Sequence, residues 1–163
     1  MERAELEREL RAHHAACFGW ALSCCRDDPQ AAEDVLHETC LRVLDGRARF
    51  RGESAFRTWL FGVIRQVASG MRRRAALRSL LLLRMDAPEP APLPNEAPAE
   101  ATLRAALRRL PTRQREVLML VFYQDLSIAE AAQALGIALG TARAHYERGK
   151  AALRVALGGG AAP

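Results

Sequence analysis

Apolar residues recur along this chain at steps of three and four positions, which is the spacing of one face of an α-helix. No stretch alternates apolar and polar residues over the length of a strand. The pattern therefore predicts an all-α protein. The expected helices cover residues 2–25, Pro29 to about 46, a segment starting behind Ser54, 103–110, a segment opened by Pro111, Ser127 to 136, and about 139–157.

Two of these helices carry clear buried stripes. One follows Asp28, an expected N-cap, and its stripe consists of Ala32, Val35, Leu36, Cys40, Val43 and Leu44. The other follows Ser54, also an expected N-cap, and its stripe consists of Phe56, Trp59, Leu60, Val63, Ile64 and Val67. Trp59 is therefore expected to lie largely in the core, whereas Phe50 and Phe61 lie off the stripe.

A proline-rich segment divides the chain. Residues 86–100 hold five of the eight prolines and no basic residue, a composition that predicts a flexible linker. The formal charge is 15 − 11 = +4 over 1–85, 0 − 4 = −4 over 86–100 and 9 − 4 = +5 over 101–163. We therefore expect two small helical domains, 1–85 and 101–157, joined by an acidic tether, with a disordered tail at 158–163.

The basic residues indicate a polyanionic partner. The net charge is +5, and Lys150 is the only lysine among 24 basic residues, so the positive charge is almost all arginine. The planar guanidinium suits phosphate and guanine better than an ammonium does. In the second domain, the helix predicted at Ser127, a glycine-bearing turn and a longer basic helix give the order of a helix-turn-helix, whose second helix enters the major groove.

Targeting and metal signals are weak. The first residues are charged and lack the apolar segment of a signal peptide, and the longest aliphatic run, 80–83, is too short to span a bilayer. We therefore expect a cytoplasmic protein with its cysteines as thiols. His13, His14 and Cys17 fall within one helical turn, but they match no standard zinc motif, so no metal or cofactor is predicted.

Both halves of the chain resemble a known family. AAEDVLHETCLRVL with FRGESAFRTWLFGVIRQVASGMRRR resembles region 2 of bacterial RNA polymerase sigma factors of the extracytoplasmic-function (ECF) group of the sigma-70 family. LPTRQREVLML with LSIAEAAQALGIALGTARAHYERGKAALR resembles region 4. The resemblance implies that the first domain binds core RNA polymerase and opens the minus-ten element, and that the second reads the minus-thirty-five element. It also implies an anti-sigma factor as a partner.

The resemblance and the positions of the polar residues together select candidate site residues. For polymerase binding they are Glu33, Asp34, His37, Glu38 and Arg42. For the minus-ten element and melting they are Phe50, Arg51, Ser54, Arg57, Phe61, Arg65, Gln66, Arg72 and Arg73. For the minus-thirty-five element they are Thr141, Arg143, Ala144, His145, Arg148, Lys150, Arg113 and Arg115.

Other functions remain open at the level of sequence. A sigma-like mimic would bind polymerase or an anti-sigma factor without reading promoters, and departures from the usual family residues at Gln66, Gly70 and His145 leave room for one. A stand-alone helix-turn-helix regulator would leave the first domain unexplained. An enzyme is the least favoured class, because the sequence has no phosphate-binding glycine loop and no nucleophile-base arrangement.

Overall fold

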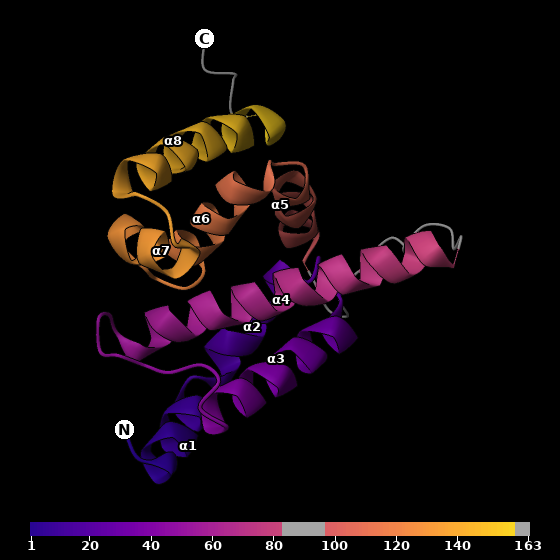
Figure 1. Cartoon of the computed structure of the whole chain (residues 1–163). Helices are drawn as coiled ribbons and strands as arrows, with labels where there is room; N and C mark the ends of the chain where they lie inside the picture. The colour runs from indigo at the N-terminus through magenta and orange to yellow at the C-terminus, as the bar shows by residue number, and fades with distance from the viewer. Residues whose placement is uncertain (83–96, 159–163) are drawn as a thin grey trace. The chain divides into compact units, whose positions relative to one another are not determined.

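A computed structural model of the chain describes residues 1–82 and 97–158, and every regular element within them is an α-helix. The chain forms two compact units, one built around the first four helices and one around the last four (Figure 1). The predicted all-α class is confirmed. The helices are α1 (Arg3–Ala12), α2 (His14–Cys24), α3 (Pro29–Leu44), α4 (Phe56–Leu81), α5 (Pro98–Arg108), α6 (Thr112–Phe122), α7 (Ile128–Leu135) and α8 (Leu139–Ala156).

The predicted linker and tail lie largely outside the described residues. Residues 86–96 of the linker and 159–163 of the tail are among those that the structure does not describe. At its other end the predicted linker overlaps a helix, because α5 already begins at Pro98, a favourable residue for the first helical turn.

The first unit packs α2, α3 and α4 against one another, with α1 against α2 and α3. Its largest buried side chain is Trp20 of α2, which is 1% exposed. The indole Nε1 of Trp20 donates a hydrogen bond of 3.0 Å to the carbonyl oxygen of Phe61 in α4. The two rings lie 6.2 Å apart between centroids, so this pair joins α2 to α4 in the centre of the core.

Residues 2–25 form two helices instead of the single predicted one. The break is at His13, whose φ of −100° and ψ of 5° are not helical. The imidazole stacks on Phe56 of α4 at 6.2 Å between centroids, and its Nε2 lies 3.5 Å from the carboxylate of Glu9. The break therefore coincides with a tertiary contact that local periodicity does not encode.

The predicted cap of α3 is confirmed and that of α4 is wrong. The Asp28 side chain accepts hydrogen bonds from the backbone amides of Gln30 (3.0 Å) and Ala31 (3.2 Å), which satisfies two free donors of the first turn. Before α4, the N-cap is Ala55, and the hydroxyl of Ser54 donates to the Ala55 carbonyl instead of accepting an amide.

The buried face of α4 is wider than its predicted stripe. Phe61 is fully buried, so the prediction that it lies outside the buried face is wrong. Trp59 is only half-buried, so it is not the core residue that was expected. The physical reason is that α4 packs against both α2 and α3, so two adjacent faces of the helix are covered. In α3, Thr39 is likewise buried, while Cys40 and Leu44 of the predicted stripe are half-buried.

The second unit has a small leucine core. Leu107, Leu110 and Leu118 are buried, and Tyr146 and Leu153 of α8 pack against them. Gly149 allows α8 to approach α6 closely, because a Cβ atom there would lie 2.8 Å from Cδ1 of Leu118. These contacts hold α8, the predicted recognition helix, against α6.

The helix-turn-helix has the predicted start. At the beginning of α7, the amide of Glu130 donates to the hydroxyl of Ser127 (3.1 Å), and the Glu130 carboxylate accepts from the Ser127 amide (2.8 Å). This reciprocal pair is a capping box. Gly136, with φ of +64°, then turns the chain toward α8, since a left-handed residue ends a helix most easily as glycine.

Replacing Gly70 with alanine should stabilise the first unit. Gly70 lies inside α4, and a Cβ atom there would meet no atom within 4 Å. Glycine costs a helix interior about 0.8–1 kcal/mol relative to alanine, so we expect a gain of nearly that size in the free energy of unfolding. Tryptophan fluorescence during urea unfolding measures it, since both tryptophans of the chain, Trp20 and Trp59, belong to this unit.

The reverse change in the same helix is the control for this prediction. Ala75 is exposed in α4, so Ala75→Gly should destabilise the unit by a similar amount. A Gly70→Ala protein that is less stable than the wild type would contradict the open space observed around Gly70.

Candidate polymerase and nucleic-acid interfaces

The predicted polymerase-binding residues share the polar side of α3. Glu33, Asp34 and His37 are exposed, and Glu38 and Arg42 are half-buried. Asp34 accepts a hydrogen bond of 3.3 Å from Nε2 of Gln30, one turn earlier. The opposite side of the helix faces the core, so this side is open to a partner.

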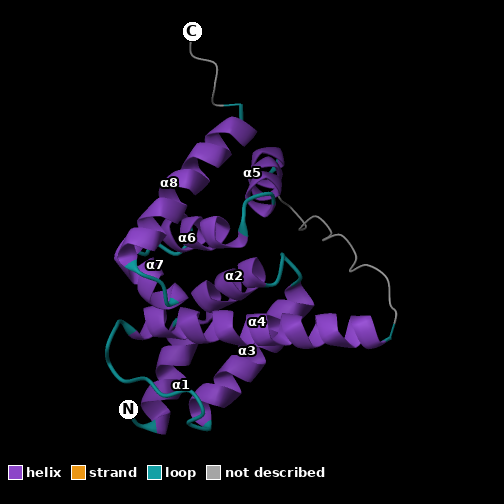
Figure 2. Ribbon diagram, turned by 45° about the horizontal axis from the view of Figure 1, so that its top comes forward, coloured by secondary structure: helices purple, strands orange, loops and turns teal. Residues whose placement is uncertain are grey.

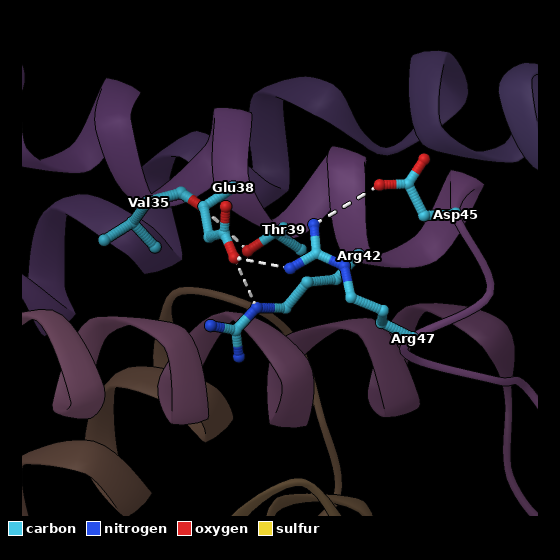
Figure 3. Close-up of polar contacts among 6 residues, drawn as sticks. All are labelled: Val35, Glu38, Thr39, Arg42, Asp45 and Arg47. Atoms are coloured by element: carbon cyan, nitrogen blue, oxygen red, sulfur yellow. Dashed lines mark hydrogen bonds and ion pairs between the residues drawn. The ribbon is translucent and has the colours of Figure 1, made fainter.

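Glu38 is the centre of an ion-pair network (Figure 3). Its Oε1 accepts hydrogen bonds from Nε of Arg42 at 2.6 Å and from Nη1 of Arg47 at 3.3 Å. The other terminal nitrogen of Arg47, Nη2, lies 3.3 Å from Oδ2 of Asp45. The hydrogen bond from Arg42, followed by the charges of both arginines, lowers the pKa of the Glu38 carboxyl. Glu38 is thus held as a carboxylate by its own chain.

The loop after α3, which connects it to α4 (Figure 2), is held by contacts at both ends. At its start, the amide of Ala48 donates to the carbonyl of Arg42 at 2.8 Å, and Nε of Arg49 donates to the Gly46 carbonyl at 3.2 Å. Further along, the ring of Phe50 lies 5.3 Å from each of the rings of Phe56 and Trp59. Between these anchors, residues 51–53 are exposed.

The structure separates the minus-ten candidates into three groups. Phe61 is completely buried and cannot stack on a base, so that prediction is corrected. Arg57 covers the Phe61 ring at 5.8 Å, and Arg72 donates to the Cys24 carbonyl and to Ser69, so both side chains already have internal contacts. The third group is exposed or half-exposed on the loop and on α4: Phe50, Arg51, Ser54, Arg65, Gln66 and Arg73.

The first half of α8 presents the minus-thirty-five candidates. Thr141, Arg143 and Arg148 are exposed, and Ala144 and His145 are half-buried. Within the described residues, neither Arg143 nor Arg148 has a hydrogen bond or ion pair, so both guanidinium groups are available to a ligand.

The other basic candidates of this unit have internal partners. The ammonium of Lys150 lies 3.2 Å from Glu147 and 4.4 Å from the centroid of the Tyr146 ring. Nη1 of Arg113 donates to the buried carboxylate of Glu116 at 3.1 Å. Arg115 donates to the Arg108 carbonyl at 3.4 Å. The sequence analysis did not identify Glu116 as the partner of Arg113, because the sequence alone does not show whether an acidic residue is buried or exposed.

Comparison with known proteins assigns each unit to a region of one protein family. Residues 10–78 match the family described as Sigma-70 region 2, and residues 100–153 match Sigma-70, region 4. The chain is 34% identical over 162 residues to the ECF RNA polymerase sigma factor SigL of Mycobacterium tuberculosis, covering 94% of this chain and 90% of SigL. The chain belongs to the ECF sigma factors. It is therefore a promoter-specific transcription initiation factor and not an enzyme.

A further relative agrees with this assignment, and two solved structures are similar in fold. The sigma factor is 33% identical over 137 residues to SigX of Bacillus subtilis, covering 78% of this chain and 71% of SigX. In fold it is similar to the sigma factor RpoE of Bartonella quintana, solved in complex with the anti-sigma factor NepR, with a TM-score of 0.76, 24% identity and coverage of 94% and 96%. CnrH, solved with the cytosolic domain of CnrY, gives a TM-score of 0.69 at 22% identity, with coverage of 98% and 92%.

Two further features of the sigma factor concern metals and membranes. Among residues 1–82 and 97–158, no group of three or more His, Cys, Asp or Glu side chains is placed to hold a metal ion, so His13, His14 and Cys17 are not brought into a ligand set. In the same described ranges, no helix has the length and apolarity needed to cross a bilayer.

Two of the buried thiols, those of Cys17 and Cys25, are held in their protonated form. Burial raises the pKa of Cys17 to about 12, with a further increase from the neighbouring Cys40, and burial raises that of Cys25 to about 11. Because the thiolate is the form that binds metals and attacks electrophiles, these two cysteines are poor candidates for either chemistry near neutral pH.

Alkaline pH should destabilise the first unit through Cys17. The pKa of its thiol is about 9 before folding and about 12 after, so the stabilisation is fully present below pH 9 and is lost as pH rises toward 12. At a pH about 1.5 units above the lower value, the loss approaches about 2 kcal/mol. Urea unfolding of wild type and Cys17→Ala at pH 8 and at that higher pH should show a smaller decrease for the variant. Equal decreases would contradict the role of this thiol.

Proposed function

We propose that the first unit docks on core RNA polymerase through the exposed acidic side of α3 and holds the opened minus-ten element with the loop after α3 and with α4. The second unit then reads the minus-thirty-five element with α8. The observation that carries this proposal is the separation of charge in the first unit, where Glu33 and Asp34 are exposed on α3 while Arg51 and Arg73 are exposed on the loop and α4. Opposite charges on separate surfaces suit one protein partner and one nucleic acid.

The exposed part of the loop is suited to an unpaired base. Arg51 has no hydrogen bond or ion pair within the described residues and can meet a phosphate, while a Cβ atom at Gly52 would meet no atom within 4 Å, so there is open space beside the backbone. Phe50 already packs on Phe56 and Trp59, so a base would extend an existing aromatic cluster. Stacking on such a ring contributes about 1–3 kcal/mol per base.

The N-terminal half of α8 is suited to the major groove. Arg143 can donate with both ends of its guanidinium to the O6 and N7 acceptors of a guanine. Arg148 lies on the same helix and suits a phosphate, which fixes position without reading sequence. The free amides at the start of α8, near Gly140 and Thr141, can hold another phosphate.

An anti-sigma factor and a cytoplasmic location complete the proposal. RpoE and CnrH, whose folds are similar, were each solved with a partner, the anti-sigma factor NepR and the cytosolic domain of CnrY. We infer that this chain also has such an antagonist and works in the cytoplasm, where RNA polymerase and promoter DNA are found. The retained arginines of the loop and α4 argue against a mimic, which has no need of a DNA-binding surface.

Transcription with purified core polymerase on genomic fragments tests the proposal. Specific initiation that depends on the added chain is the expected result. Binding to polymerase with no initiation on any fragment would favour the sigma-like mimic. A chain that does not bind polymerase at all would refute both functions.

A further inference from the structure

We propose that Arg47 is a positioning residue for promoter opening, which ties the start of the base-binding loop to the polymerase-docking helix α3 through Glu38. This inference rests on the proposed function, because it assigns a role within the same two surfaces. In the sequence Arg47 is one of three arginines of the loop before Gly52, and only the folded structure brings it to Glu38.

Arg47 differs from the other loop arginines in its contacts. Its two terminal nitrogens are both engaged, Nη1 with Glu38 and Nη2 with Asp45, each at 3.3 Å (Figure 3). Arg51, four residues later, is exposed and has no such partner within the described residues. A guanidinium that already binds two carboxylates is poorly placed to neutralise a phosphate, so Arg47 and Arg51 have different roles.

Glu38 connects the docking helix to the loop. It lies on the same helix as the exposed Glu33, Asp34 and His37, and its carboxylate also receives Arg42 at 2.6 Å. With side-chain exposure of 24% for Glu38 and 51% for Arg47, the pair is partly shielded from water, which strengthens it relative to a fully exposed pair. The position of the loop is therefore set by the helix that docks on polymerase.

The backbone strengthens this connection. The amide of Ala48 bonds to the carbonyl of Arg42, and the amide of Asp45 bonds to that of Leu41, each at 2.8 Å. These backbone bonds fix the direction in which the chain leaves α3, and the side chain of Arg47, which lies between them, adds its bond to Glu38. Phe50 and Arg51 follow directly, and a small change in that direction would move both relative to the DNA.

The test compares Arg47→Gln with Arg51→Gln in promoter opening and in salt dependence. Wild type and variants are added to core polymerase at saturating concentration, and permanganate reactivity of minus-ten thymines measures opening. Arg47→Gln should slow opening by about fivefold, the size expected for a partly shielded ion pair. Its promoter affinity should keep the wild-type salt slope, whereas Arg51→Gln should reduce that slope by about 0.7–0.9, the value for one phosphate.

Two further variants separate positioning from other effects. Glu38→Gln should also slow opening, and the double variant should slow it by less than the product of the two single effects, because both changes break the Glu38–Arg47 pair. Each single change also breaks one pair of its own, Glu38 with Arg42 and Arg47 with Asp45. Arg3→Gln is the matched control: it removes one charge and one exposed ion pair, to Glu7 on α1, and should leave opening unchanged. Tryptophan fluorescence verifies that each variant is folded.

The outcomes separate this inference from the proposed function. Opening at the wild-type rate by Arg47→Gln would overturn the inference, and so would a salt slope reduced as much as by Arg51→Gln, which would make Arg47 a direct phosphate contact. If the wild type itself opens no promoter, the proposed function fails, and with it the basis of the inference.

Discussion

Trp20→Ala should lower the free energy of unfolding of the first unit by about 3–5 kcal/mol, the range for truncating a large buried aromatic side chain. Trp20 is 1% exposed and packs from α2 against Phe61 of α4, so the truncation leaves a cavity at the centre of the core. It also leaves the Phe61 carbonyl without the indole donor that it has in the wild type. Urea unfolding of the full chain, followed by circular dichroism and by the fluorescence of the remaining Trp59, measures the effect.

A matched pair of conservative variants tests whether the burial and the hydrogen bond of Trp20 cause this loss of stability. Trp20→Phe keeps an aromatic ring but removes the hydrogen bond, and should still cost clearly more than Trp59→Phe. Trp59 is half-buried in a cluster with Phe50 and Phe56, and its indole has no hydrogen bond within the described residues. If the two variants lose the same stability, Trp20 does not have the central role that its burial and hydrogen bond assign to it.

Arg143→Ala should weaken binding to the minus-thirty-five duplex by about 1–3 kcal/mol and relax the preference at one base position. The reason is that an exposed guanidinium with no internal partner, near the start of α8, can form a paired hydrogen bond with guanine. Binding of the full chain with core polymerase to a set of promoter fragments, each changed at one upstream base pair, measures both effects.

Arg148→Ala is the control for this prediction. Arg148 is also exposed and without a partner in the described residues, but we assign it to a phosphate, so its loss should weaken all sequences equally. If Arg143→Ala behaves in the same way, with no change in base preference, then Arg143 also holds the backbone and another residue of α8 reads the sequence.

Helix caps, which are local features, were predicted best from the sequence. Asp28 caps α3 and Ser127 caps α7 because each cap is a contact between residues two or three positions apart, which the sequence contains directly. At Ser54 the same reasoning failed, since α4 begins one residue later and the hydroxyl makes a different bond. The sequence predicts which residue types form a cap, but the exact first residue of a helix also depends on the contacts of the preceding loop.

The site was predicted less completely than the fold. The exposure of Glu33 and Asp34 on α3 and of Arg143 and Arg148 on α8 was predicted, because polar positions follow from the helical period. Phe61 was assigned to the DNA surface, yet it packs on Trp20, forty-one residues away, so a single helical stripe could not reveal its burial. Arg72 and Arg113 were selected for their charge, although their contacts with Cys24 and Glu116 are internal.

The sequence by itself determined the helical class, most helix positions, the basic character of both units and the family, because periodicity, caps and charge are local properties of the chain. Only the tertiary structure decided which aromatic ring is core and which arginines are free. It alone brought Arg47 of the loop to Glu38 of α3. The physical reason is that burial and ion pairing depend on which helix faces are covered by other helices, and that is a property of packing between distant segments.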